Sequence, residues 1–99
     1  MVQAQIKQFQ ATVIGRVQGV GFRYWVRNQA VSLGLYGWVR NLQTGNVQVL
    51  AQGDPAALGK LIDALYQGPS RAWVERVNVE WQTVDTSLTG FEIKTTSYY

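Results

Sequence analysis

Hydrophobic and polar residues alternate along several stretches of the chain, and this two-residue period predicts β-strands. The predicted strands run from Phe9 to Val17, from Tyr36 to Leu42, over residues 46–52, from Trp73 to Gln82 and, as a short last one, from Phe91 to Ile93. Residues 1–8 are largely polar, and we expect this start of the chain to be frayed. Because successive side chains of a strand point to opposite faces, each strand has one face available for a core.

Two other stretches carry apolar residues three or four positions apart, which is the period of a helix. The apolar positions are Phe22, Val26, Ala30 and Leu33 in the first stretch and Leu58, Leu61, Ile62 and Leu65 in the second. Gly34 is a natural end for the first helix. Asp54 can cap the second helix, with Pro55 in its first position, and Gly68 can end it.

The resulting order is strand, helix, two strands, helix, strand and an extra short strand, which is typical of a ferredoxin-like α+β sandwich. Right-handed crossovers favour an antiparallel sheet in the order 4-1-3-2, plus the short C-terminal strand, with two helices on one face. We expect residues 1–99 to form a single domain. In this topology the ends of the first two strands lie at the same edge of the sheet, about 10 Å apart.

The loop between the first strand and the first helix reads Val17-Gln18-Gly19-Val20-Gly21-Phe22-Arg23. Two glycines spaced by one residue allow a tight turn whose N–H groups point one way, and the start of the helix adds unpaired N–H groups. Together these groups form a cradle for an anion. Arg23 falls in the first helical turn, where a cation costs roughly 0.3–1 kcal/mol unless a bound phosphate reverses the sign. The alternative is a plain strand-to-helix turn with an exposed arginine.

Charge is distributed unevenly along the chain, although the net charge is only +3. No acidic residue precedes Asp54, whereas five basic residues do: Lys7, Arg16, Arg23, Arg27 and Arg40. This uncompensated positive field suits an anion, although a generic basic surface would have the same composition. The sequence has no cysteine, signal peptide or transmembrane stretch, so we expect a soluble, cytoplasmic protein.

The residues near the predicted cradle restrict the chemistry that it can perform. The chain has no histidine or cysteine, and no carboxylate in its first half, so we expect no metal, no cofactor and no side-chain nucleophile there. An acyl phosphate suits such a site, because its carboxylate leaving group has a pKa of roughly 4 and needs no general acid. Asn41, at the end of the second strand, could orient the attacking water, or it could simply be a turn residue. The water's proton could pass to the substrate's own phosphate.

Two motifs resemble the acylphosphatase family. They are the loop Val17–Arg23 and the segment Gly37-Trp38-Val39-Arg40-Asn41, which is followed by Gly45-Asn46-Val47. The segments Gln52-Gly53-Asp54 and Gly68-Pro69-Ser70-Arg71-Ala72 also resemble family segments, so the likeness extends from Phe9 to Ile93. Thr44 and Tyr66 depart from residues that are frequent in the family, but both positions concern turn geometry or packing.

The resemblance implies hydrolysis of the carboxyl–phosphate bond of acyl phosphates, without metal and without a covalent intermediate. It implies that Arg23 and Asn41 are the catalytic residues, with Asn41 positioning the water. The phosphate would be bound by Arg23 and by the loop residues Val17, Gln18, Gly19, Val20, Gly21 and Phe22. We expect a monomer that acts on small acyl phosphates and is inhibited by its product, inorganic phosphate. Carbamoyl, acetyl and phosphoglyceroyl phosphate remain open as the physiological substrate.

Two other functions occur in proteins with this order of elements or this type of domain. RNA-binding domains share the same order of elements, but they stack bases on aromatic residues of the central strands, and residues 46–52 contain neither an aromatic nor a basic residue. We therefore expect no nucleic-acid partner and no membrane partner. Acylphosphatase-like domains also begin a larger hydrogenase-maturation protein that handles carbamoyl phosphate and continues into Cys-rich zinc motifs, whereas this chain has no cysteine.

Several other residues have a structural interpretation. We expect Arg40 to be a solvated surface residue, and Arg16 and Arg27 to add only to the positive field. Gly15 either relieves crowding in the first strand or marks a bulge. The four tryptophans, Trp25, Trp38, Trp73 and Trp81, are expected to pack in the core or along the sheet edges.

Overall fold

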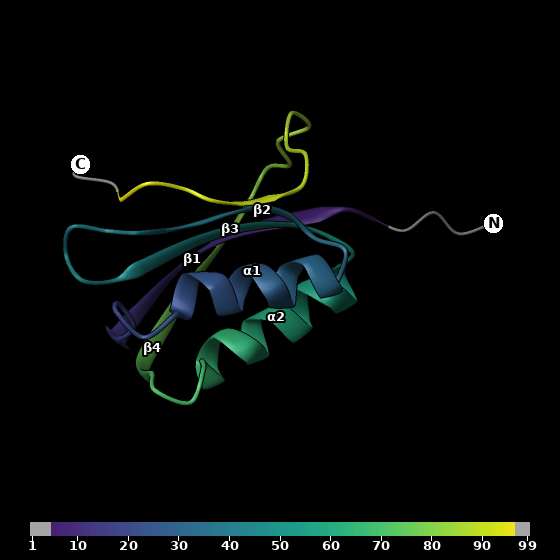
Figure 1. Cartoon of the computed structure of the whole chain (residues 1–99). Helices are drawn as coiled ribbons and strands as arrows, with labels where there is room; N and C mark the ends of the chain where they lie inside the picture. Colours follow the sequence, from purple (N-terminus) through teal and green to yellow (C-terminus); the bar gives the residue numbers. More distant parts are fainter. Residues whose placement is uncertain (1–4, 97–99) are drawn as a thin grey trace.

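A computed structural model describes residues 5–96 of the chain, and within them two helices cover one face of a five-stranded sheet (Figure 1). The elements are β1 (Lys7–Arg16), α1 (Phe22–Ser32), β2 (Tyr36–Asn41), β3 (Val47–Gly53), α2 (Pro55–Gln67), β4 (Trp73–Gln82) and β5 (Phe91–Ile93). The strand order is β4-β1-β3-β2-β5. This is the predicted ferredoxin-like α+β fold. No helix among the described residues is long and apolar enough to cross a membrane.

The sheet is mixed rather than antiparallel throughout. The four long strands pair antiparallel as predicted, but β5 pairs parallel to β2, with Gly37 opposite Phe91 and Val39 opposite Ile93. The chain leaves β4 at one edge of the sheet, crosses over and adds β5 at the other edge, where it runs in the direction of β2. An N–H of Gly37 donates to the carbonyl of Gly90, and an N–H of Lys94 donates to that of Val39, which fixes both ends of this short pairing.

The start of β1 corrects the expectation of a frayed segment over residues 1–8. Residues 1–4 lie outside the described part of the chain, but Lys7 and Gln8 belong to β1. Gln8 is only 4% exposed, and its side chain accepts a hydrogen bond from Gln52 Nε2 at 2.9 Å and donates one to Gln82 Oε1 at 3.2 Å. A polar residue can therefore occupy a strand position here because neighbouring strands satisfy its hydrogen bonds.

The core lies between the helices and the sheet. Phe9, Ala11 and Val13 of β1 face it together with Val47, Val49 and Ala51 of β3, and these residues are fully buried. The helices contribute Phe22, Val26 and Ala30 from α1 and Leu58, Leu61 and Leu65 from α2. Each large apolar side chain buried in this way contributes about 1.5–3 kcal/mol. Ile62, the remaining member of the predicted stripe, packs against this core while partly exposed.

Gly15 serves both of the roles considered for it. The register of β1 against β4 shifts between Ile14 and Gly15, which marks a bulge. A Cβ at Gly15 would lie 2.2 Å from the carbonyl oxygen of Trp73, so no larger residue fits without moving the backbone. The extra residue lies on β4, where Glu75 falls between the partners of Ile14 and Gly15, so the bulge bends β4 beside the end of β1.

The tryptophans only partly follow the expectation. Trp81 meets the ring of Phe9 edge-on at 5.7 Å, and Trp25 lies 5.9 Å from the ring of Phe22. Trp73 is instead 75% exposed at the start of β4. The packing interpretation is therefore wrong for Trp73, because the first residue of an edge strand has few neighbours to cover it.

The two helices begin in opposite ways. At α2, the predicted cap is confirmed: Asp54 Oδ2 accepts from the N–H groups of Ala56 and Ala57 at 3.1 and 3.3 Å. At α1, the N-cap is Gly21 in a left-handed conformation, with no side-chain cap and no acidic residue in the first turn. The positive end of the α1 dipole is therefore left uncompensated by the chain itself.

Candidate active site

The end of β2 and the loop after β1 meet at one edge of the sheet, as the topology predicts. Between them lies a cavity of about 150 Å³. It is lined by Val17, Gly19, Gly21, Phe22, Arg23, Tyr24 and Asn41. The structure thus brings together both predicted catalytic residues and four of the six predicted loop residues.

Two glycines of the loop line this cavity in left-handed backbone conformations. Gly19 and Gly21 have φ values of 73° and 77°, in the left-handed region that favours glycine, although a Cβ at either position would meet no atom within 4 Å. Glycine is therefore favoured at these two positions by the backbone conformation and not by lack of space for a side chain. The N–H of Trp25 makes the first bond within the helix, to the carbonyl of Gly21 at 3.1 Å. The N–H groups of the three residues before it are free of that helical pattern.

Arg23 occupies the second position of α1, in the same uncapped turn. Its guanidinium makes no side-chain hydrogen bond among the residues that the structure describes. A cation at this place adds to the positive end of the helix dipole instead of opposing it. An anion in the cavity would neutralise both the charge of Arg23 and the positive end of the helix dipole. The guanidinium can bind two of the anion's oxygens while backbone N–H groups bind others.

Asn41 supplies the most informative atom of the site. It pairs with Val47, whose side chain faces the core, so Asn41 also faces the helix layer rather than the open side of the sheet. Within residues 5–96, its Oδ1 is the one buried side-chain polar atom that lacks a hydrogen-bond partner. Leaving such an atom unsatisfied costs about 1–3 kcal/mol. An unpaired acceptor beside an electropositive cavity indicates a position for a donor that the chain does not provide, such as water.

The remaining two predicted loop residues do not line the cavity. Val20 packs against the hydrophobic core. The side-chain amide of Gln18 turns toward the β2–β3 hairpin and donates to the carbonyls of Leu42 and Asn46, each at 2.8 Å. Their side chains therefore contact other parts of the protein rather than the cavity. Tyr24, which the sequence interpretation missed, lines the cavity while 66% exposed, and no pattern in the sequence distinguishes it from a surface residue.

Arg40 does not behave as the expected solvated residue. It lies on the face of β2 opposite to that of Asn41, where its Nε donates to Gln48 Oε1 at 2.8 Å. Its guanidinium stacks 4.7 Å from the ring of Trp38, over which Lys94 also lies at 5.1 Å. The expectation was wrong because Trp38 and Gln48 provide a ring and an acceptor on the same open face of the sheet.

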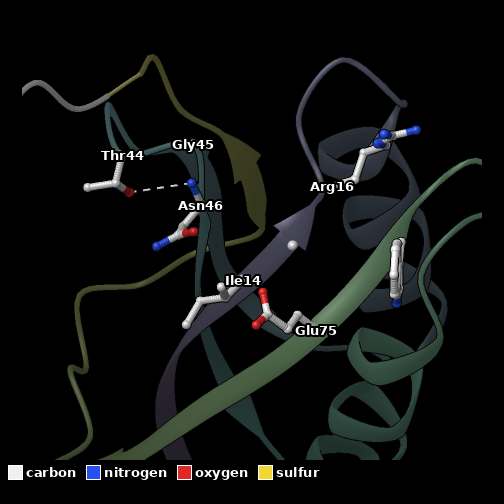
Figure 2. Close-up of a pocket in the computed structure, with 8 residues that line it drawn as sticks. Ile14, Arg16, Thr44, Gly45, Asn46 and Glu75 are labelled. Carbon is white, nitrogen blue, oxygen red and sulfur yellow. Dashed lines mark hydrogen bonds between the residues drawn. The ribbon is translucent and has the colours of Figure 1, made fainter.

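A larger cavity of about 550 Å³ lies nearby, between the end of β1, the start of β4 and the β2–β3 turn (Figure 2). Ile14 and Glu75 lie at its base, and Thr44 accepts a hydrogen bond from the N–H of Asn46 at 3.4 Å in its wall. None of the predicted site residues lines it, and it contains no buried polar side-chain atom that lacks a partner among the described residues. The smaller cavity is therefore the candidate active site.

Comparison with known proteins decides the family. The family model for acylphosphatase matches residues 9–93. The chain belongs to the acylphosphatase family. An acylphosphatase of Salinibacter ruber is 43% identical over 88 residues, which is 89% of this chain and 93% of the relative. The structure of an acylphosphatase from Coxiella burnetii superposes with a TM-score of 0.88 and 38% identity, covering 95% of this chain and all of that one.

As an acylphosphatase, the protein is an enzyme that hydrolyses acyl phosphates. Part of a much longer protein is also similar: full-length HypF in its phosphate- and nucleotide-bound form matches with a TM-score of 0.87 and 28% identity. That match covers 96% of this chain but only 13% of HypF. The chain is thus similar along nearly its whole length both to small acylphosphatases and to one segment of a large protein.

Proposed function

We propose that the cavity at the start of α1 binds the phosphoryl group of the substrate and that Asn41 positions the attacking water. The observation that supports this most directly is the unpaired, buried Oδ1 of Asn41 in a cavity that it shares with Arg23 and the uncapped end of α1. One side of the cavity offers donors for an anion. The other offers an acceptor that no described group of the protein uses.

In this proposal, the loop amides and Arg23 hold the phosphoryl oxygens. The backbone N–H groups at the start of α1 are fixed in place before the substrate arrives, so they need no reorganisation as charge develops. The guanidinium of Arg23 is a planar cation that can bind two oxygens at once. Inorganic phosphate presents the same oxygens, and we therefore propose that it inhibits by occupying the same cradle.

The chemical step needs only water and the substrate. The water donates one hydrogen bond to Asn41 Oδ1, which directs its oxygen lone pair toward phosphorus. As the new P–O bond forms, the bond between phosphorus and the acyl oxygen breaks, and the bonding electrons leave with the carboxylate. That leaving group needs no proton, because its pKa is roughly 4. The water's proton passes to a phosphoryl oxygen, so the products are a carboxylate and inorganic phosphate with no covalent enzyme intermediate.

We propose that this reaction proceeds without a metal ion. Among residues 5–96, no group of three or more His, Cys, Asp or Glu side chains could hold one, and the cavity is lined by no carboxylate. The charge that a metal would neutralise in other phosphoryl-transfer enzymes falls here to Arg23 and the helix N-terminus. Every element assigned to the site faces the phosphoryl group, so several acyl groups should be accepted.

Hydrolysis of benzoyl phosphate, followed by its ultraviolet absorbance, tests these assignments. We expect wild-type turnover to persist in excess EDTA. Arg23→Ala should abolish both turnover and inhibition by phosphate, because the same guanidinium is proposed to bind the substrate's phosphoryl group and inorganic phosphate. Asn41→Ala should lower kcat by roughly 100-fold or more with little change in KM, because it removes an interaction of the attacking water.

Two surface variants provide matched controls. Arg27→Ala removes an exposed arginine one turn further along α1, and Asn78→Ala removes an exposed asparagine of β4. Both should retain wild-type kinetics. Phosphate inhibition that survives in Arg23→Ala would refute the cradle, and an Asn41→Ala effect confined to KM would make Asn41 a binding residue instead.

A further inference from the structure

We propose that Gln18 is a positioning residue that holds the phosphate loop in register with Asn41. This inference rests on the proposed roles of the loop and Asn41. Gln18 follows β1 by two residues, yet its side chain reaches the far hairpin, 24 and 28 residues along the chain, to donate to the carbonyls of Leu42 and Asn46. Leu42 is the residue directly after Asn41.

The sheet itself does not join these two parts of the site. β1 and β2 are separated by β3, and β3 pairs with β1 only as far as Val13 opposite Val47. The last three residues of β1 and the loop therefore run beyond the start of β3. Among the side-chain hydrogen bonds of the described residues, the two from Gln18 are those that join this loop to the β2–β3 hairpin.

The hairpin does not need Gln18 in order to close. The carbonyl of Asn46 already accepts from the N–H of Leu42 at 2.9 Å, and the carbonyl of Leu42 already accepts from the N–H of Gly45 at 3.1 Å. A carbonyl oxygen has two lone pairs, and the amide of Gln18 uses the second one on each. Losing that amide should therefore leave the turn intact and free the loop to move relative to Asn41.

Such freedom should affect catalysis more than phosphate binding. Binding requires only the loop and Arg23, which belong to one continuous segment, residues 17–23. Attack also requires that the water at Asn41 lie in line with phosphorus, and a displacement of about 1 Å can cost on the order of 100-fold in rate. The expected signature is a fall in kcat of roughly 10- to 100-fold, with the inhibition constant of phosphate changed by less than about 3-fold.

Gln18→Met tests this inference, since methionine has a similar length and no donor. The variant should be made alone and together with Asn41→Ala, and its kcat, KM and phosphate inhibition constant measured with benzoyl phosphate. If Gln18 acts through the position of Asn41, Gln18→Met should change kcat by less than about 2-fold once Asn41 is absent, because residues that act as a unit are not additive. Gln10→Met is the matched control. Gln10 lies on β1, away from the loop, and its Oε1 accepts a hydrogen bond from Gln82 Nε2. Removing this bond should leave kcat unchanged.

Three outcomes would overturn the inference: an unchanged kcat in Gln18→Met, an equal loss in the presence and absence of Asn41, or a parallel loss of phosphate binding. Gln18→Asn, which keeps the amide but shortens its reach, should show the same kcat loss and serves if the methionine variant does not fold. Turnover by the wild type and its loss in Asn41→Ala test the proposed function separately. A failure of the proposed function can therefore be distinguished from a failure of the positioning role of Gln18.

Discussion

At the scale of single residues, Asn41 shows a conflict between stability and catalysis. Its Oδ1 is buried without a hydrogen-bond partner among residues 5–96, an arrangement that lowers the free energy of unfolding, whereas the same atom is the proposed acceptor for the attacking water. Functional sites commonly keep such unfavourable features because the chemistry requires them. The conflict can be tested by removing the polar atoms while keeping the volume.

Asn41→Leu should abolish hydrolysis without lowering the free energy of unfolding, and could raise it by roughly 1 kcal/mol, because an apolar side chain of similar size leaves no unpaired acceptor. Urea unfolding of both proteins without phosphate, beside benzoyl phosphate turnover, measures the two effects. A loss of more than about 1 kcal/mol would show that the Asn41 amide is already hydrogen-bonded in the ligand-free protein, for example to ordered water, and would contradict the stability cost assigned to its Oδ1.

The positions of single residues were predictable from sequence only where they follow from local structure. Arg23 and Asn41 could be placed because a strand-to-helix turn and the end of a strand fix the direction of their neighbours. The side chains of Gln18 and Arg40 could not be placed. Their partners are set by tertiary packing, and an unpaired glutamine or arginine gives the same sequence pattern as a paired one.

At the scale of elements, the two helices show how local sequence separates structure from function. Asp54 and Pro55 cap the start of α2, whereas the start of α1, with Gly21 and Arg23, has no side-chain cap and no acidic residue. The helices and the Asp54 cap were predictable from the sequence, and the predicted strand limits lie within two residues of those observed. The parallel pairing of β5 was not predictable, because three residues carry no signal for the direction of their partner.

The connection between β4 and β5 offers a pH test. Asp85 Oδ1 accepts hydrogen bonds from the hydroxyl and the N–H of Ser87, and these lower the pKa of Asp85 below its usual value of 3.8. A lowered pKa in the folded protein means that the ionised carboxylate stabilises the fold above the unfolded pKa, and that this contribution is lost as the pH falls through the folded pKa. Asp85→Asn should therefore be less stable than the wild type at pH 7.

The difference between the two proteins should shrink as the pH falls below about 4, where the wild-type carboxyl also becomes neutral. Thermal unfolding from pH 7 to pH 2.5 measures it. The backbone of Asp85 contacts Gln8 and Gln52 through its N–H and carbonyl, and these bonds are independent of charge, so they should persist in the variant. A difference that stays constant across the range would show that the ionised carboxylate is not responsible.

At the scale of the whole molecule, the proposed phosphate site at the start of α1 should couple phosphate binding to the stability of the entire fold. The cavity is lined by Phe22 and Val17, which are also core residues, so an anion bound there is bound only by the folded chain. A ligand that binds only the folded state stabilises it by about 2.7 kcal/mol at 100 times its Kd. For a domain of this size, that corresponds to a rise in Tm of roughly 10–20 °C.

Inorganic phosphate should therefore raise the Tm of the wild type in a saturable way, measured against chloride at equal ionic strength. Asn41→Ala should show nearly the full rise, because Asn41 is assigned to the water, whereas Arg23→Ala should lose most of it. Phosphate also stabilises proteins generally through its exclusion from their surfaces, and that part should be equal in all three proteins. Only the difference between the variants reports on the site, so identical rises would show that phosphate acts on the solvent and that the start of α1 does not bind it.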